Sequence, residues 1–202
     1  MISSEKEKLF SYEYEHLSIG ITETGAPLQA VPIPWYGYCG ASNMCIPDIY
    51  LCEEDLYDRE IIAQLNRFTI IGFYAFCRLK SYEILAFFSE LQDIFLEDAK
   101  NLHDISFIKG MPRLLMLFLQ NATLTNLDPI IFLNELPNIE HCRYLGLYNC
   151  HVKDISSLLN SDHCFRELLI WNHWNPTEHN RWQQVKSQFY RYYRLASTPR
   201  KN

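Results

Sequence analysis

An apolar pattern with a period of about 23 residues constrains this sequence more than any other feature. Between residues 91 and 113, apolar side chains recur first at an offset of two, from Ile94 to Leu96, and then at offsets of three, as in Leu102, Ile105 and Ile108. An offset of two suits a short strand with one buried face, and offsets of three suit a helical or 3₁₀ return segment. The unit therefore predicts a strand followed by a return segment, because a single amphipathic helix would not keep the offset of two.

The same pattern continues in both directions along the chain. In each of six predicted strands, two residues at an offset of two are both apolar: Ile49/Leu51, Ile71/Phe73, Ile94/Leu96, Leu117/Leu119, Leu145/Leu147 and Leu168/Ile170. An insertion of about five residues, near 136–140, precedes the fifth pair. Because internal repeats of this length stack into arrays, the sequence predicts one elongated domain with a continuous core.

The copy around residues 145–155 resembles the leucine-rich repeat family. It reads Leu145-Gly-Leu147-Tyr-Asn-Cys150-His-Val152, which follows the frame L-x-x-L-x-L-x-x-(N/C)-x-L, and the resemblance covers residues 46–174. It implies an α/β fold, a solenoid of about six short repeats with parallel strands on its concave side, similar to the bacterial and phosphatase-regulator-like subtypes. The family's asparagine position is occupied here by Glu54, Phe76, Ala99, Ala122, Cys150 and His173, so we expect the family's usual buried asparagine ladder to be absent.

Residues 1–45 do not fit the repeat and are interpreted as an N-terminal cap. Leu17, Ile19 and Ile21 alternate with polar or small residues, and a turn signal follows around Gly25. This pattern predicts a β-hairpin, which is followed by an irregular loop rich in aromatic residues. A cap of this kind would cover the open apolar face of the first repeat.

Residues 175–202 are interpreted as a C-terminal cap. The sequence Asn-Pro-Thr-Glu at 175–178 is typical of a helix start. Trp182, Val185 and Phe189 then recur at helical spacing, and a basic tail follows them. We therefore expect a closing helix that packs on the last repeat.

Composition and charge exclude several classes of function. The formal net charge is −6, whereas a nucleic-acid-binding protein would present a basic face. No apolar run approaches the ~20 residues that cross a bilayer, and the first residues do not form a secretory signal. The seven cysteines are odd in number and form no C-x-x-C pair, which favours a reducing compartment. We expect a cytoplasmic protein that binds neither nucleic acid nor membrane, and the sequence predicts no particular oligomeric state.

The strand residues that alternate with the inward positions are the candidate binding site. On a concave face these side chains would meet solvent, and the set is rich in aromatic and acidic groups. The candidate partner-binding residues are Asp48, Tyr50, Tyr74, Asp93, Phe95, Glu97, Met116, Phe118, Gln120, Tyr144, Tyr148, Glu167 and Trp171. Exposed aromatic residues usually mark a binding surface, and acidic residues favour a basic partner. The sequence thus predicts a non-enzymatic module that binds a basic protein, for example an adaptor or an immunity protein that neutralises a basic toxin.

Three other interpretations are open. Loops or caps could cover the concave face and make Phe95 and Phe118 ordinary core residues. Cys39, in a glycine-rich loop, faintly resembles the nucleophile of papain-like proteases and would need a histidine base close to it. Zinc takes four cysteine or histidine ligands. The last two repeats contain a candidate set: His141, Cys142, Cys150, His151, His163, Cys164 and His173. Inward cysteines beside solvated histidines explain the same residues, so no metal and no cofactor is expected.

Overall fold

The structure is a computed structural model of the 202-residue chain, and it describes residues 15–28, 47–135, 142, 144–157 and 167–171. The strands in these ranges are β1 (His16–Ile21), β2 (Ile49–Leu51), β3 (Thr69–Ala75), β4 (Asp93–Leu96), β5 (Met116–Gln120), β6 (Thr123–Leu124), β7 (Tyr144–Tyr148), β8 (His151–Val152) and β9 (Glu167–Trp171). The α-helices are α2 (Arg59–Leu65) and α3 (Asp128–Glu135), and the 3₁₀ helices are η3 (Glu53–Tyr57), η4 (Glu83–Phe87) and η5 (Ser106–Gly110).

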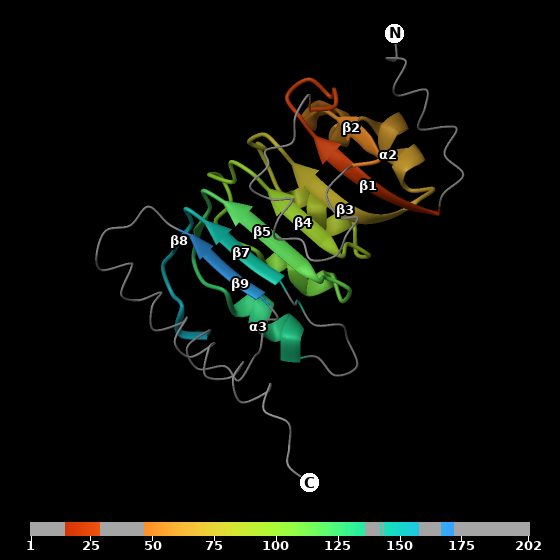
Figure 1. The fold of residues 1–202 in the computed structure, drawn as a ribbon. Coiled ribbons are helices and arrows are strands. Elements are labelled where there is room, and N and C mark those ends of the chain that lie inside the picture. Colours follow the sequence, from red (N-terminus) through yellow and green to blue (C-terminus); the bar gives the residue numbers. More distant parts are fainter. Residues whose placement is uncertain (1–14, 29–46, 136–141, 143, 158–166, 172–202) are drawn as a thin grey trace.

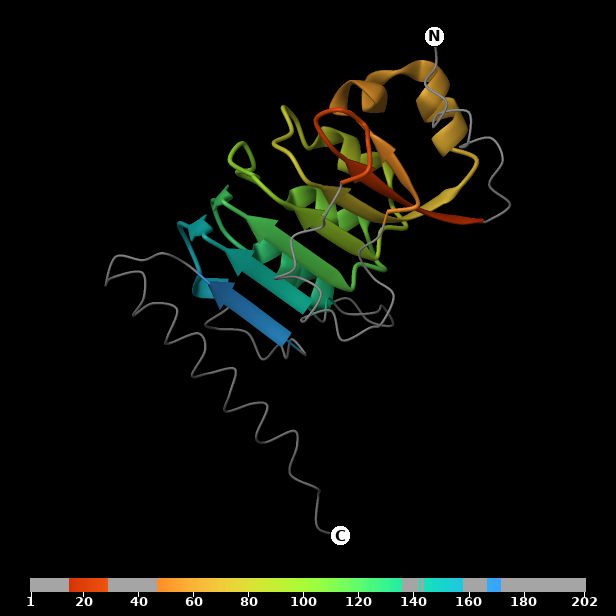
Figure 2. The ribbon, with the colours of Figure 1, turned by 45° about the horizontal axis from the view of Figure 1, so that its top comes forward.

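Seven strands form one sheet in the order β2-β1-β3-β4-β5-β7-β9, and every neighbouring pair is parallel (Figure 1). Strands β6 and β8 form a separate parallel pair. Parallel neighbours need crossover connections, and η4, η5 and α3 lie in those between β3 and β7. Figure 2 shows the strands side by side with these helical segments behind them. The predicted α/β fold with parallel strands is therefore confirmed.

The predicted inward positions pair with one another across the sheet. Phe73 pairs with Ile94, Ile94 with Leu117, Leu117 with Leu145, and Leu145 with Leu168. The first four of these side chains are fully buried in the main core. Predicted positions of the return segments complete that core, namely Leu79, Leu85, Leu102, Ile105, Ile108, Leu127 and Ile130. Short strands and return segments thus bury one shared apolar layer.

Strand β1 shows that the predicted N-terminal hairpin is wrong. Ile19 pairs in parallel with Ile49 of β2 on one side and with Phe73 of β3 on the other. Because a strand has only two edges, β1 has none left for an antiparallel partner. The apolar alternation identified a buried strand correctly, but it did not identify the neighbours of that strand. Residues 29–45 and the predicted closing helix at 175–202 lie outside the described residues.

An irregularity in β3 moves one predicted core residue. Leu17 pairs with Ile70 and Ser18 with Gly72, so Ile71 is an extra residue opposite β1. An extra residue in one strand reverses which face the preceding side chains occupy. Ile70 is therefore buried in the main core, whereas Ile71, predicted to point inward, is only half-buried.

Candidate functional site

A second apolar cluster covers the sheet face that the main core does not. Its centre consists of Tyr74, Phe95, Met116 and Phe118. These residues alternate along their strands with residues of the main core, so they project from the opposite face. This surface is referred to below as the aromatic face.

Strand register brings the rings of the aromatic face together. Tyr74 pairs with Phe95, and Phe95 pairs with Phe118. The rings of Phe95 and Phe118 stack with centroids 5.2 Å apart and an interplanar angle of 15°. Phe118 in turn pairs with Gly146, where an added Cβ would lie 2.1 Å from the Cδ2 atom of Phe118. A glycine at 146 is therefore what leaves room for the Phe118 ring.

The prediction that the centre of this face meets solvent is wrong. Only 3% of Tyr74, 6% of Phe95, and 8% of both Met116 and Phe118 is exposed. The physical reason is that strand alternation fixes the side to which a residue points but not whether that side is covered. Here the centre of the face is covered, which agrees with the alternative that Phe95 and Phe118 are core residues.

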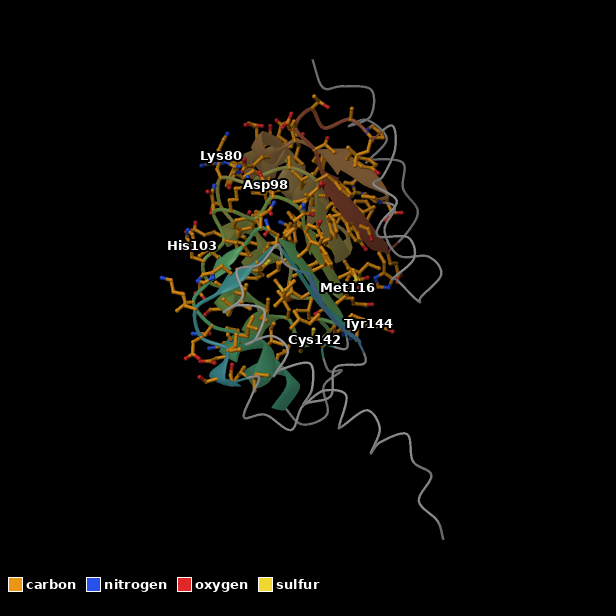
Figure 3. All side chains as sticks on the ribbon, turned by 60° about the vertical axis from the view of Figure 1, so that its left-hand side comes forward. Lys80, Asp98, His103, Met116, Cys142 and Tyr144 are labelled. Atoms are coloured by element: carbon orange, nitrogen blue, oxygen red, sulfur yellow. The ribbon has the colours of Figure 1, made fainter. Side chains whose placement is uncertain are left out.

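A half-buried rim surrounds this centre. It consists of Asp93, Glu97, Gln120, Tyr144 and Tyr148, all of which were in the predicted site. Asp93 opens β4, and Glu97 follows its last residue, so the two acids lie at opposite ends of one strand. Tyr148 pairs with Gln120, and Tyr144 pairs with Met116, beside which Figure 3 shows it. The rim residues thus retain access to solvent, unlike the buried centre that they surround.

Asp93 is the most perturbed acid of the rim. Its Oδ1 atom is buried and accepts no hydrogen bond within the described part of the chain. The residues paired with it on either side, Gly72 and Met116, have no side-chain N–H or O–H to donate. Burial raises the pKa of the Asp93 carboxyl to about 7. Burial, with the charge of Asp98 second, also raises the pKa of Glu97.

Two residues of the predicted site, Asp48 and Tyr50, lie apart from this rim. Asp48 and Tyr50 belong to the end of the sheet formed by β2, and β1 separates them from Tyr74. The Asp48 Oδ2 atom accepts a hydrogen bond of 2.7 Å from the backbone N–H of Ser18. The side chains of Glu167 and Trp171 in β9 lie outside the described part of the structure.

Phe76 belongs to the aromatic face, although it was assigned to the family's asparagine position. It packs against the second cluster, and its ring centroid is 5.6 Å from that of Phe95. Its offset of two from Tyr74 is the sequence signal that would have placed it there.

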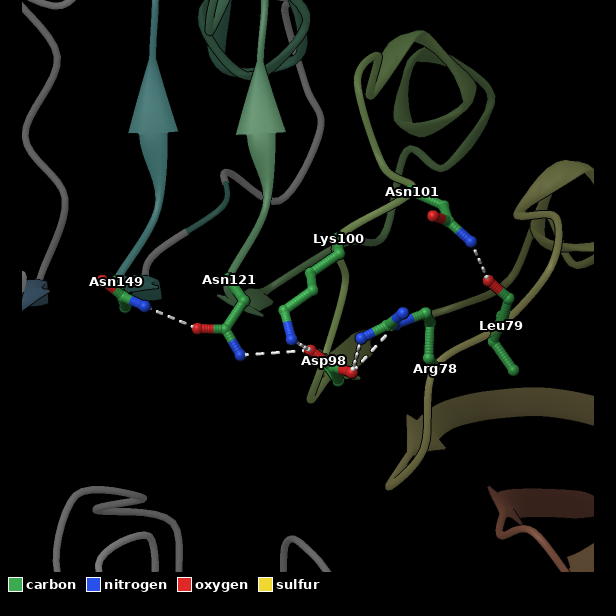
Figure 4. A network of polar contacts seen from close by, with 7 residues as sticks. All are labelled: Arg78, Leu79, Asp98, Lys100, Asn101, Asn121 and Asn149. Carbon is green, nitrogen blue, oxygen red and sulfur yellow. Dashed lines mark hydrogen bonds and ion pairs between the residues drawn. The ribbon is translucent and has the colours of Figure 1, made fainter.

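A ladder of Asp and Asn side chains joins the ends of three neighbouring strands (Figure 4). Asn149 Nδ2 donates to Asn121 Oδ1 at 2.7 Å, and Asn121 Nδ2 donates to Asp98 Oδ1 at 3.3 Å. Asp98 also accepts from Arg78 Nε at 2.9 Å and pairs with Lys100 Nζ at 3.0 Å. Asn121 and Asn149 have φ of 62° and 50°, a left-handed conformation that asparagine tolerates. This ladder is partly exposed and forms one position before the family's asparagine position, so it differs from the buried ladder that the sequence predicts to be absent.

The cysteines and histidines proposed as a metal site do not converge where the structure describes them. Cys142 and Cys150 are buried in the main core, and Cys150 Sγ donates to the Leu119 carbonyl at 3.2 Å. Burial raises the pKa of both thiols to about 12, which disfavours the thiolate that binds zinc. Among the described residues, no three His, Cys, Asp or Glu side chains form a metal-binding group. The candidate ligands His141, His163, Cys164 and His173 lie outside those residues, and so does Cys39, the candidate nucleophile.

Comparison with models of known protein families and with curated proteins finds no match. None of the helices in the described ranges is long and apolar enough to cross a bilayer.

Proposed function

We propose that this chain is a non-enzymatic, cytoplasmic protein-binding module of the leucine-rich-repeat kind, which binds a basic protein through the rim of its aromatic face. The observation that carries the proposal is the charge of this surface. The rim contains Asp93 and Glu97, and none of the described strands contains a lysine or an arginine. A basic partner would meet no positive charge from these strands, and the two acidic groups would accelerate its association.

Support for a repeat solenoid comes from the register and the return segments. The inward rows pair residue for residue from β3 to β9, and 3₁₀ or α-helical segments connect the strands from β3 to β7. Stacked short repeats would produce this arrangement, and solenoids generally bind through the face that their strands line.

The rim, rather than the buried centre, is proposed to contact the partner. The centre is already covered, so Phe95 and Phe118 contribute chiefly to folding. Tyr144 and Tyr148 are half-buried and can still lose surface to a partner, and tyrosine is enriched among residues that dominate binding energy. An adaptor or a toxin-neutralising immunity protein would use such an acidic and aromatic rim.

The test is a charge reversal at the rim with a matched reversal elsewhere. Glu97→Lys changes the rim, and Glu83→Lys makes the same change in η4, where the side chain is exposed. Affinity capture from native cells with the wild-type protein identifies the partner. We expect a basic protein whose affinity falls by about tenfold or more with E97K, which is about 1.4 kcal/mol, and is unchanged with E83K. Equal binding by all three proteins, or an acidic partner, would overturn the proposal.

A further inference from the structure

The Asp93 carboxyl group lacks the partners that a buried acid needs. Its Oδ1 atom is shielded from solvent and receives no hydrogen bond from any described residue, yet the residue as a whole remains partly exposed. A carboxylate in this environment is costly unless a donor or an opposite charge reaches it. The fold therefore leaves a place for a cationic donor at this end of β4.

Among the residues that the structure describes, the charged groups near Asp93 do not supply that cation. Glu90 and Arg113 precede β4 and β5, but they pair with each other, with Arg113 Nη1 3.2 Å from Glu90 Oε2. On β4 itself, the next side chain on the same face is the phenyl ring of Phe95, and Glu97 follows it. Across the neighbouring strands, Gly72 and Met116 carry no charge.

The geometry of the carboxyl group distinguishes between the two basic side chains. A guanidinium group binds best when both carboxylate oxygens accept from its planar fork. Because Asp93 Oδ1 is buried, only Oδ2 faces a ligand from solvent. A lysine ammonium is a compact charge that needs one oxygen, and its methylene stem can lie along a tyrosine ring of the rim.

We propose that Asp93 receives the ammonium group of a single lysine of the partner, whose methylene stem lies along the half-buried Tyr144 of the rim. Tyr144 pairs with Met116, which pairs with Asp93, so the three residues form one row across β4, β5 and β7. This inference rests on the proposed binding of a basic protein and specifies which of its side chains enters the site. Ring faces near an ammonium group add cation–π attraction.

The experiment uses the full-length protein and a lysine model compound, so it does not need the partner. The probe is Nα-acetyl-lysine methylamide, added to protein labelled with ¹³C at aspartate carboxyls, and Asp93→Asn identifies the Asp93 resonance. We expect saturable shifts of that resonance with a Kd of roughly 10 mM, the weak affinity of one ion pair with a short apolar stem. The corresponding arginine compound should bind several-fold more weakly. The Glu83→Gln variant removes one acidic charge elsewhere and should bind the lysine compound as the wild type does.

An unchanged Asp93 resonance, or arginine binding at least as tight as lysine binding, would overturn the inference. If that happens while Glu97→Lys still weakens partner binding, only the lysine site is wrong. If the lysine compound binds at Asp93 but Glu97→Lys leaves capture unchanged, the proposed function is wrong instead.

Discussion

The phenyl rings of Phe95 and Phe118 stack across two neighbouring parallel strands, with centroids 5.2 Å apart and planes 15° from parallel. The residues are direct partners in the register of β4 and β5, so the stack follows from the strand pairing. It lies opposite the main core, and the middle of the sheet is therefore buried on both faces. Burial on both faces is usual for parallel sheets, and here aromatic rings provide the second layer.

Replacement of Phe95 by alanine should destabilise the fold even though this residue lies in the predicted binding site. Removing a buried phenyl ring should lower the free energy of unfolding by about 3–5 kcal/mol, because contacts are lost and a cavity remains. Phe87→Ala is the matched control, since Phe87 is 79% exposed and its loss should change stability by less than about 0.5 kcal/mol. Urea denaturation followed by circular dichroism measures both changes. Equal stability of the two variants would contradict the burial of the aromatic face.

Gly146→Ala should reveal how closely Phe118 approaches β7. The new methyl group would lie 2.1 Å from Phe118 Cδ2, so the ring must move, and we expect a loss of about 1–3 kcal/mol in the free energy of unfolding. Gly110→Ala is the control, because a Cβ there meets no atom within 4 Å. In a Phe118→Ala background the added methyl group should cost less, and a double-mutant cycle detects this coupling. Additive effects would mean that ring and glycine do not interact.

Much of the fold could be predicted because the spacing of apolar residues distinguishes the strands from the return segments. The residue pair Ile94 and Leu96 has the offset of a strand, and Leu102, Ile105 and Ile108 have the offset of a 3₁₀ or helical segment. All five side chains are buried in the main core. Periodicity predicts such positions well because it reports directly which side chains must avoid water.

Other features could not be predicted because they depend on contacts between distant segments. Ile19 identifies a buried strand, but nothing local indicates that this strand lies between β2 and β3. Gly72 directly follows the extra residue in β3, but a glycine inside a strand does not by itself show that Ile71 changes face. The site was predicted in part for the same reason, since alternation placed Phe95 and Glu97 on the correct face but could not show that only Glu97 stays partly exposed.

Asp98→Ala should weaken the ladder at the strand ends in a salt-dependent way. Partial desolvation opposes ionisation, but hydrogen bonds from Lys100 and Arg78 outweigh it and hold the pKa of Asp98 below its usual value. We expect a loss of no more than about 1 kcal/mol in the free energy of unfolding at neutral pH, because solvent screens these partly exposed pairs. A lowered pKa gives stability that is present above the unfolded-state pKa and is lost as pH falls through the folded-state value. Denaturation at low and high salt tests this, and Glu54→Ala, which breaks a fully exposed pair with Lys80, should leave the midpoint unchanged.

The titration of Asp93 should make the protein less stable as pH rises from about 4 to 7. Burial raises the pKa of this carboxyl from 3.8 to about 7, so in this window the folded state holds a proton that the unfolded state has released. Stability then falls with rising pH, with a slope of at most about 1.4 kcal/mol per pH unit from this one group. The side chain of Asp93→Asn stays neutral throughout. The free energy of unfolding of this variant, minus that of the wild type, should therefore increase from about pH 4 to 7 and stay constant at higher pH. Urea denaturation at several pH values measures the difference. A difference that is constant with pH would show that Asp93 ionises normally and would contradict the desolvated environment on which its proposed role depends.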